Sequence, residues 1–220
     1  MKYRSVFDII GPVMIGPSSS HTAGAARIGR LARLLFGEAP TEVQIHLYGS
    51  FAKTYRGHGT DVALAGGLLD FDTFDERLPE SIQLAEDQGI QLRWFEEHAV
   101  TDHPNTVRLR LKKGEREMEI VGISIGGGKV EITELNGFDL RLSGHHPAIF
   151  IVHQDRYGVI AEVSNQLAER EMNIGHMEVS RRDKGEEALM VIEVDQPVDA
   201  AVLTDLEKLD HVIQVAKIQD

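Results

Sequence analysis

The last third of the chain alternates apolar and polar residues in a pattern that few folds can accommodate. Short β-branched runs alternate with amphipathic segments, and turn-forming residues separate them. The pattern predicts strand 148–153, helix 158–170, strand 173–181, a turn at Lys184-Gly185, strand 187–194, helix 199–208 and strand 211–218. This βαββαβ order is typical of the ferredoxin-like split βαβ fold, in which two helices cover one face of an antiparallel sheet.

The preceding residues predict a separate α+β domain with mixed or antiparallel strand pairing. The periodicity of apolar residues favours helices at 22–36, 60–69 and 79–88, and strands at 43–48, 90–95, 106–111, 117–125 and 130–135. Gly144 and Pro147 then interrupt the periodicity. We therefore expect two domains, one at 1–143 and the other at 148–220.

Composition and charge exclude several classes of function. The chain has 220 residues, with 23 Lys and Arg against 35 Asp and Glu, a net charge of −12, and no basic cluster. A phosphate backbone or an anionic membrane surface would repel it, so we expect neither nucleic acid nor membrane as a partner. Residues 1–8 lack the apolar region of a secretory signal, and no run of about 20 apolar residues could span a bilayer. The predicted location is the cytoplasm.

Cysteine is absent from the sequence. Its absence excludes a disulfide framework, a thiol nucleophile, and any thiolate-held zinc or iron–sulfur centre supplied by this chain alone. Histidine is frequent, with 10 residues, but these lack the spacing of a metal-binding helix. We therefore expect no metal site in this chain.

Three serines and a histidine precede the first predicted helix, in the order Ser18-Ser19-Ser20-His21-Thr22. One serine or threonine suffices to cap a helix, so three exceed that requirement. Hydroxyl groups beside the free N–H groups of a helix start favour a carboxylate or a phosphate. An imidazole placed there can act as a general acid or base near neutral pH. The motif leaves both anion binding and catalysis open.

A second histidine lies between two glycines, in Gly57-His58-Gly59-Thr60-Asp61, just before the next predicted helix. Flanking glycines permit positive φ angles and the close approach of a ligand. Capping of the helix explains Thr60 or Asp61 but not His58, which favours a functional role for the histidine. Asp61 can alternatively orient an imidazole.

The two motifs, followed by His103-Pro104-Asn105 and Ile125-Gly126-Gly127-Gly128, closely resemble the β chain of bacterial iron–sulfur-dependent L-serine dehydratases. The resemblance spans the whole chain. Residues 1–143 resemble an allosteric-substrate-binding domain, a fold shared with some phosphoglycerate dehydrogenases. Residues 148–220 resemble an ACT domain, a small βαββαβ module found in many regulated amino-acid enzymes.

The resemblance implies a reaction of serine catabolism and gluconeogenesis. L-Serine loses water to give an aminoacrylate, which becomes pyruvate and ammonia, and a [4Fe–4S] cluster acts as Lewis acid on the serine hydroxyl. Because this chain lacks cysteine, the cluster is expected on a separate α chain. The family pattern makes His21 and His58 the candidates for proton handling. It places Ser18, Ser19, Ser20, Thr22, Thr60, Asp61 and Asn105 in a substrate cleft that faces the α chain.

Two alternatives remain open at this point. The first domain resembles a binding domain, so its serines and histidines can instead bind serine as an effector. The whole chain can likewise be a non-catalytic amino-acid sensor. The presence or absence of an α chain with cluster-binding cysteines distinguishes the sensor from the enzyme.

The ACT resemblance implies effector binding at Tyr157, Gly158, Asn173 and Ile174. It also implies self-association, through an edge strand or the open face of the sheet, because an unpaired edge is a liability. Many effector-binding ACT domains have proline before this glycine, where the present chain has Tyr157. Assembly without effector binding is therefore the alternative role of this domain.

Overall fold

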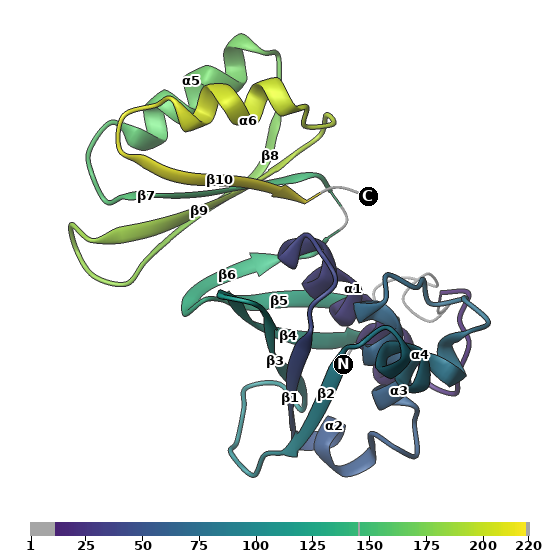
Figure 1. Ribbon diagram of the computed structural model, residues 1–220. Coiled ribbons are helices and arrows are strands. Elements are labelled where there is room, and N and C mark those ends of the chain that lie inside the picture. The colour runs from purple at the N-terminus through teal and green to yellow at the C-terminus, as the bar shows by residue number, and fades with distance from the viewer. Residues whose placement is uncertain (1–11, 145, 219–220) are drawn as a thin grey trace. The chain divides into compact units, whose positions relative to one another are not determined.

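The computed structural model describes residues 12–144 and 146–218, and its contacts divide the chain after Asn136 into two compact units (Figure 1). The division falls before the predicted boundary at 143–147, because the strand that follows Asn136 contacts the second unit. The domain limits 1–143 and 148–220 stay a prediction. Residues 1–8, where no secretory signal was expected, and His145 lie outside the described residues.

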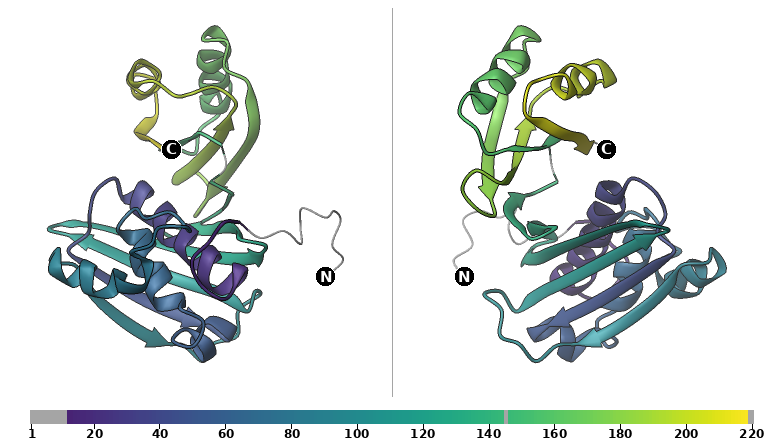
Figure 2. Two further views of the ribbon diagram at one scale, coloured as in Figure 1. Left: turned by 90° about the vertical axis from the view of Figure 1, so that its right-hand side faces the viewer. Right: turned by 60° about the vertical axis from the view of Figure 1, so that its left-hand side comes forward.

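The first unit contains a mixed sheet with helices on one of its faces (Figure 2). Its strands are β1 (Glu42–Tyr48), β2 (Gln91–Glu96), β3 (Asn105–Lys113), β4 (Arg116–Gly126) and β5 (Lys129–Leu135), in the spatial order β2-β1-β3-β4-β5. β1 and β2 are parallel and the other neighbours are antiparallel, which confirms the mixed pairing. The helical elements are the π-helix η2 (Ser19–Ala23), α1 (Gly24–Phe36), α2 (Gly49–Thr54), α3 (Thr60–Leu68), the 3₁₀ turn η3 (Leu78–Glu80) and α4 (Ser81–Asp87).

Close packing of α1 on α3 organises the helical layer over this sheet. Val43, Ile45 and Leu47 of β1 are fully buried on one face of the sheet and form the centre of the core. Where the two helices meet, a Cβ on Gly67 would lie only 2.1 Å from the carbonyl oxygen of Ala26. Glycine at this position therefore permits the backbones of α1 and α3 to touch.

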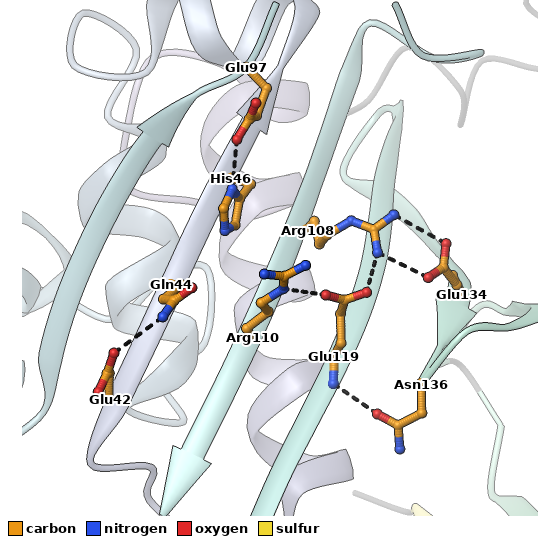
Figure 3. A network of polar contacts seen from close by, with 9 residues as sticks. All are labelled: Glu42, Gln44, His46, Glu97, Arg108, Arg110, Glu119, Glu134 and Asn136. Carbon is orange, nitrogen blue, oxygen red and sulfur yellow. Dashed lines mark hydrogen bonds and ion pairs between the residues drawn. The ribbon is translucent and has the colours of Figure 1, made fainter. Parts of the chain in front are cut away.

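The other face of the first sheet carries a network of charged side chains (Figure 3). Arg108 pairs with Glu119 and with Glu134, whose Oε1 lies 3.1 Å from Arg108 Nη1. Arg110 also pairs with Glu119, and the arginines lower the pKa of that carboxyl although its burial opposes the change. Opposite charges on neighbouring strands stabilise a sheet and keep this face polar.

The second unit confirms the predicted ferredoxin-like order. It contains β6 (Phe138–Leu142), β7 (Ala148–Gln154), α5 (Val159–Glu169), β8 (Ile174–Arg181), β9 (Glu187–Val194), α6 (Ala200–Glu207) and β10 (Val212–Ile218). The last four strands form an antiparallel sheet in the order β10-β7-β9-β8. Ile151 and Ile192 of this sheet share one buried core with Val163 of α5 and Leu206 of α6. Both helices therefore cover the same face (Figure 1).

The strand β6 lies against β8 and β9 on the face of this sheet that the helices leave open. The backbone N–H of Arg141 donates to Glu178 Oε2 at 2.9 Å, and Ser143 Oγ lies 3.3 Å from Glu193 Oε1. We expected this open face to be available for self-association, but β6 of the same chain covers part of it. No helix within the described residues is long and apolar enough to cross a bilayer.

Candidate functional site

The serine motif forms a π-helical turn that leads directly into α1. Ser18 is its N-cap, because the residue is extended, with a φ of −141°, and its Oγ accepts the backbone N–H of His21 at 3.2 Å. The backbone N–H of Ser18 donates in turn to Thr22 Oγ1 at 3.3 Å. One serine provides the cap, so capping does not explain Ser19 and Ser20. Short π-helical turns occur frequently at functional sites.

Hydroxyl groups hold both ring nitrogens of His21. Its Nδ1 lies 3.0 Å from Ser20 Oγ and 3.4 Å from Ser18 Oγ, and its Nε2 lies 2.9 Å from Ser50 Oγ. The edge of the ring also meets Phe51, with the two centroids 5.4 Å apart. Within the described residues, no hydrogen bond joins this imidazole to a carboxylate. A neutral ring, with one donor and one acceptor nitrogen, is therefore fully satisfied here.

The fold brings His58 beside His21. The two imidazole rings are nearly perpendicular, at 88°, and their centroids lie 4.8 Å apart. Thr22 Oγ1 donates to the carbonyl oxygen of His58 at 2.8 Å, which ties the glycine-flanked loop to η2. His58 is exposed, and its ring makes no hydrogen bond to any described residue. The pair thus combines one engaged imidazole with one that is open to a ligand.

Electrostatics favour the neutral form of His21. Burial, and then the nearby charge of His58, lower the pKa of His21 below its ordinary value of 6.5. The imidazole is therefore uncharged near pH 7, where it can serve as a proton acceptor or as a polar partner.

The remaining residues of the glycine-flanked motif begin α3. Gly59 is the N-cap, with a φ of +65°. Thr60 is completely buried, and its hydroxyl has no hydrogen-bond partner in the described part of the chain. Asp61 Oδ1 accepts the N–H of Val62 at 2.9 Å. A substrate contact from Thr60 would require access to its buried hydroxyl, so the binding roles of Thr60 and Asp61 stay predictions.

Asn105 begins β3 and lies against the segment that follows β1. It forms an isolated bridge with Gly49, and the N–H of Ser50 donates to the carbonyl oxygen of Pro104 at 2.7 Å. The N–H of Asn105 donates to His103 Nδ1 at 3.1 Å, and burial lowers the pKa of His103. The third motif therefore reaches the histidine pair through the segment that contains Ser50.

Sequence reasoning did not single out Ser50, although its hydroxyl contacts His21. The available signal was its position, because it follows Gly49 directly after the carboxyl end of β1. Polar residues at the carboxyl ends of strands frequently line binding sites. The position of Ser50 in the sequence does not predict its contact with His21, because His21 lies 29 residues earlier in the chain.

The predicted effector residues lie at two places in the second unit. Tyr157 is fully exposed, and Gly158, with a φ of +94°, is the N-cap of α5. Asn173 Nδ2 donates to Asp195 Oδ2 at 2.6 Å, and Ile174 packs against the core of the unit. The side chain of Asn173 therefore already has a partner. Effector binding at these residues stays a prediction.

An iron–sulfur cluster does not fit the donors that this chain offers. The sequence contains no cysteine, so no thiolate is available to hold iron. Among the residues that the structure describes, no three His, Asp or Glu side chains gather as metal ligands.

Comparison with known proteins places the chain in a family. The family model of the serine dehydratase beta chain matches residues 5–134, and that of the ACT domain matches residues 148–211. The chain is 64% identical over its full length to the whole of a probable L-serine dehydratase beta chain from Bacillus subtilis (strain 168). It is 36% identical over 197 residues, 88% of each chain, to the L-serine dehydratase beta chain of Peptoniphilus asaccharolyticus. A D-3-phosphoglycerate dehydrogenase of Bacillus subtilis is 24% identical over 88% of this chain and 37% of the dehydrogenase.

The chain therefore belongs to the serine dehydratase beta-chain family, and it carries an ACT domain in its C-terminal third. Family membership confirms the resemblance that the serine, histidine and glycine motifs carried. It also confirms the α+β architecture with a C-terminal ACT domain.

Proposed function

We propose that the chain is the β subunit of an L-serine dehydratase, which converts L-serine to pyruvate and ammonia together with an α subunit. The observation that carries the proposal is the perpendicular His21–His58 pair beside serine hydroxyls, in a chain of this family. The relatives are named beta chains, which implies a partner α chain. Because this chain has no thiolate, we assign the [4Fe–4S] cluster to that partner.

The two histidines are suited to different tasks. The ring of His58 is exposed and unengaged, so it can accept the α-proton of serine as the C–H electron pair becomes the Cα–Cβ double bond and the hydroxyl leaves. Both ring nitrogens of His21 are hydrogen-bonded to serine hydroxyls, so this imidazole stays neutral beside His58. We therefore propose His58 as the base and His21 as its neutral neighbour in proton handling.

The polar groups around the pair can hold the substrate carboxylate. The hydroxyls of Ser18 and Ser20 are hydrogen-bonded to the ring of His21, and the hydroxyl of Thr22 is hydrogen-bonded to the carbonyl oxygen of His58. The hydroxyl of Ser19 has no hydrogen-bond partner in the described part of the chain. N–H and O–H donors at the start of a helix favour a carboxylate. These four residues and Asn105 are the proposed substrate-binding residues nearest to the histidines.

The second unit is proposed to mediate assembly. In its sheet the edge strands are β8 and β10, and β6 contacts part of the open face. Edge pairing with another copy would satisfy unpaired N–H and C=O groups. Effector binding at Tyr157, Gly158, Asn173 and Ile174, and a cytoplasmic location, complete the proposal.

Pyruvate formation tests the proposed reaction. The chain is purified alone and as a complex with its α chain under anaerobic conditions, and both are assayed with L-serine. We expect a folded but inert isolated chain and an active complex. Deamination by the pure, metal-free chain would contradict the proposal that catalysis requires the cluster of the α subunit. Serine binding with no turnover in the complex would favour the amino-acid sensor instead.

A further inference from the structure

Ser50 lies where three of the candidate motifs meet, although it belongs to none of them. Its Oγ lies 2.9 Å from Nε2 of His21 in the serine motif. Its backbone N–H donates at 2.7 Å to Pro104, in the segment that leads into Asn105. The ring of His21 in turn lies beside that of His58, with 4.8 Å between the centroids. A single residue in the first turn of α2 therefore connects all three motifs.

The backbone at this junction fixes the position of the Ser50 side chain. Gly49 has a φ of +55°, and a Cβ there would lie 2.6 Å from the carbonyl oxygen of Pro104. Only glycine permits this approach without strain. The carbonyl oxygen of Ser50 accepts a hydrogen bond from Thr54 Oγ1 at 2.8 Å, which closes the turn of α2. With both backbone groups engaged, only the side-chain torsions of Ser50 remain free.

The hydroxyl of Ser50 faces the nitrogen of His21 that no other described residue contacts. Nδ1 has two serine hydroxyls within 3.4 Å, whereas Nε2 has Ser50 alone. In a neutral imidazole one nitrogen donates and the other accepts, so Ser20 and Ser50 must take opposite roles. Loss of the Ser50 hydroxyl would leave Nε2 without a protein partner among the described residues and would remove its influence on which ring nitrogen carries the proton.

We propose that Ser50 is a positioning residue that holds the tautomer and ring plane of His21, and through that ring the orientation of His58. The proposal deepens the proposed function and rests on it, because it assigns a role in the same reaction. The hydrogen-bond partners that orient metal-bound imidazoles typically change activity by about 10- to 100-fold, and we expect an effect of the same order for this metal-free imidazole.

Nitrogen-15 NMR of the isolated chain tests the tautomer without the α chain. The ring nitrogens of His21 are measured in the wild type, Ser50→Ala and Ser50→Thr. The matched control is Ser164→Ala, which removes the hydroxyl of a half-buried serine in α5 that donates only to the Ile160 carbonyl oxygen. We expect altered His21 ring shifts in Ser50→Ala and near wild-type shifts in Ser50→Thr and the control. Unchanged His21 shifts in Ser50→Ala would overturn the proposal.

Activity of the assembled enzyme gives the second measurement. We expect Ser50→Ala to lower kcat by about 10- to 100-fold, with KM within roughly twofold and a shifted pH profile, and Ser50→Thr to restore kcat. A wild-type kcat in Ser50→Ala would also overturn the proposal. If Ser50→Ala does not fold, Ser50→Cys, of nearly the same size, is measured in the NMR experiment. An inactive wild-type complex would refute the proposed reaction, while the NMR result would still decide whether Ser50 sets the tautomer.

Discussion

Replacement of Gly67 by alanine tests whether the packing of α1 on α3 holds the two histidines together. The new Cβ would lie 2.1 Å from the carbonyl oxygen of Ala26 and 2.6 Å from the nitrogen of Arg30. Both are backbone atoms, so no side-chain rotation relieves the overlap. Because protein interiors are close-packed, the two helices must separate by about 1 Å.

The expected loss of stability follows from two opposing effects. Alanine in a helix interior is normally favoured over glycine by about 1 kcal/mol. Overpacking of a dense interior costs about 1–3 kcal/mol, and a contact with backbone belongs at the upper end of that range. The net loss is about 1–2 kcal/mol in the free energy of unfolding, which lowers Tm by roughly 3–8 °C for a unit of this size.

Separation of the helices should also disturb the site. α1 continues from the turn that contains His21, and α3 begins directly after the His58 loop. The bond from Thr22 to the His58 carbonyl should therefore weaken, and kcat of the complex should fall together with Tm.

Thermal unfolding by circular dichroism measures the stability of Gly67→Ala, and pyruvate formation measures its activity. The stability control is Gly57→Ala, where φ is not positive and the new Cβ would meet only the Thr54 carbonyl oxygen, at 3.7 Å. Its free energy of unfolding should stay within about 0.5 kcal/mol of the wild type. A Gly67→Ala chain as stable as the wild type would refute the packing argument.

Three further predictions address the histidines and the ACT domain. Changing His21 or His58 to alanine should lower kcat of the complex by roughly 100-fold or more, with little change in Tm; wild-type turnover in both variants would return these residues to a structural role. Because the pKa of His21 is lowered in the folded chain, the unfolded chain binds more protons below about pH 6.5, and the free energy of unfolding should fall as the pH decreases through that region. Urea unfolding at several pH values should give a smaller decrease for His21→Gln, and equal slopes would contradict the assignment. Deletion of residues 148–220 should reduce the oligomeric state in light scattering while residues 1–143 stay folded, and an unchanged state would place association in the first unit.

The regular elements could be predicted where the periodicity was long enough to be read. In the ACT domain each predicted strand and helix agrees with the structure to within one residue. The helix α2 and the strand β6 were missed, because six and five residues show too few repeats of either period. The π-helical turn was included in the predicted helix 22–36 only in part, since its serines favour a cap.

The candidate site could be predicted in its parts but not in its assembly. The serine motif and the glycine-flanked His58 stood out because simple capping left residues unexplained. Their contact depends on the packing of α1 against α3, which no local pattern encodes. Ser50 could not be predicted as part of the site, because a Gly-Ser pair after a strand is common in sequences. Only the fold, which places the imidazole of His21 beside its hydroxyl, indicates a role for it.

The π-helical form of η2 gives the serine segment a geometric constraint as well as a chemical one. Ser19–Ala23 winds more widely than the regular helix that follows it. Each residue of an α-helix turns the chain by about 100°, and each residue of this wider turn by somewhat less, so one residue more or fewer between His21 and Gly24 would rotate His21 by an angle of that order relative to the apolar side of α1. The two residues between His21 and Gly24 thus set the direction in which the imidazole points, while the packing side of α1 stays the same. An insertion or deletion between His21 and Gly24 changes the angle at which His21 leaves the helix axis, which no substitution there can do.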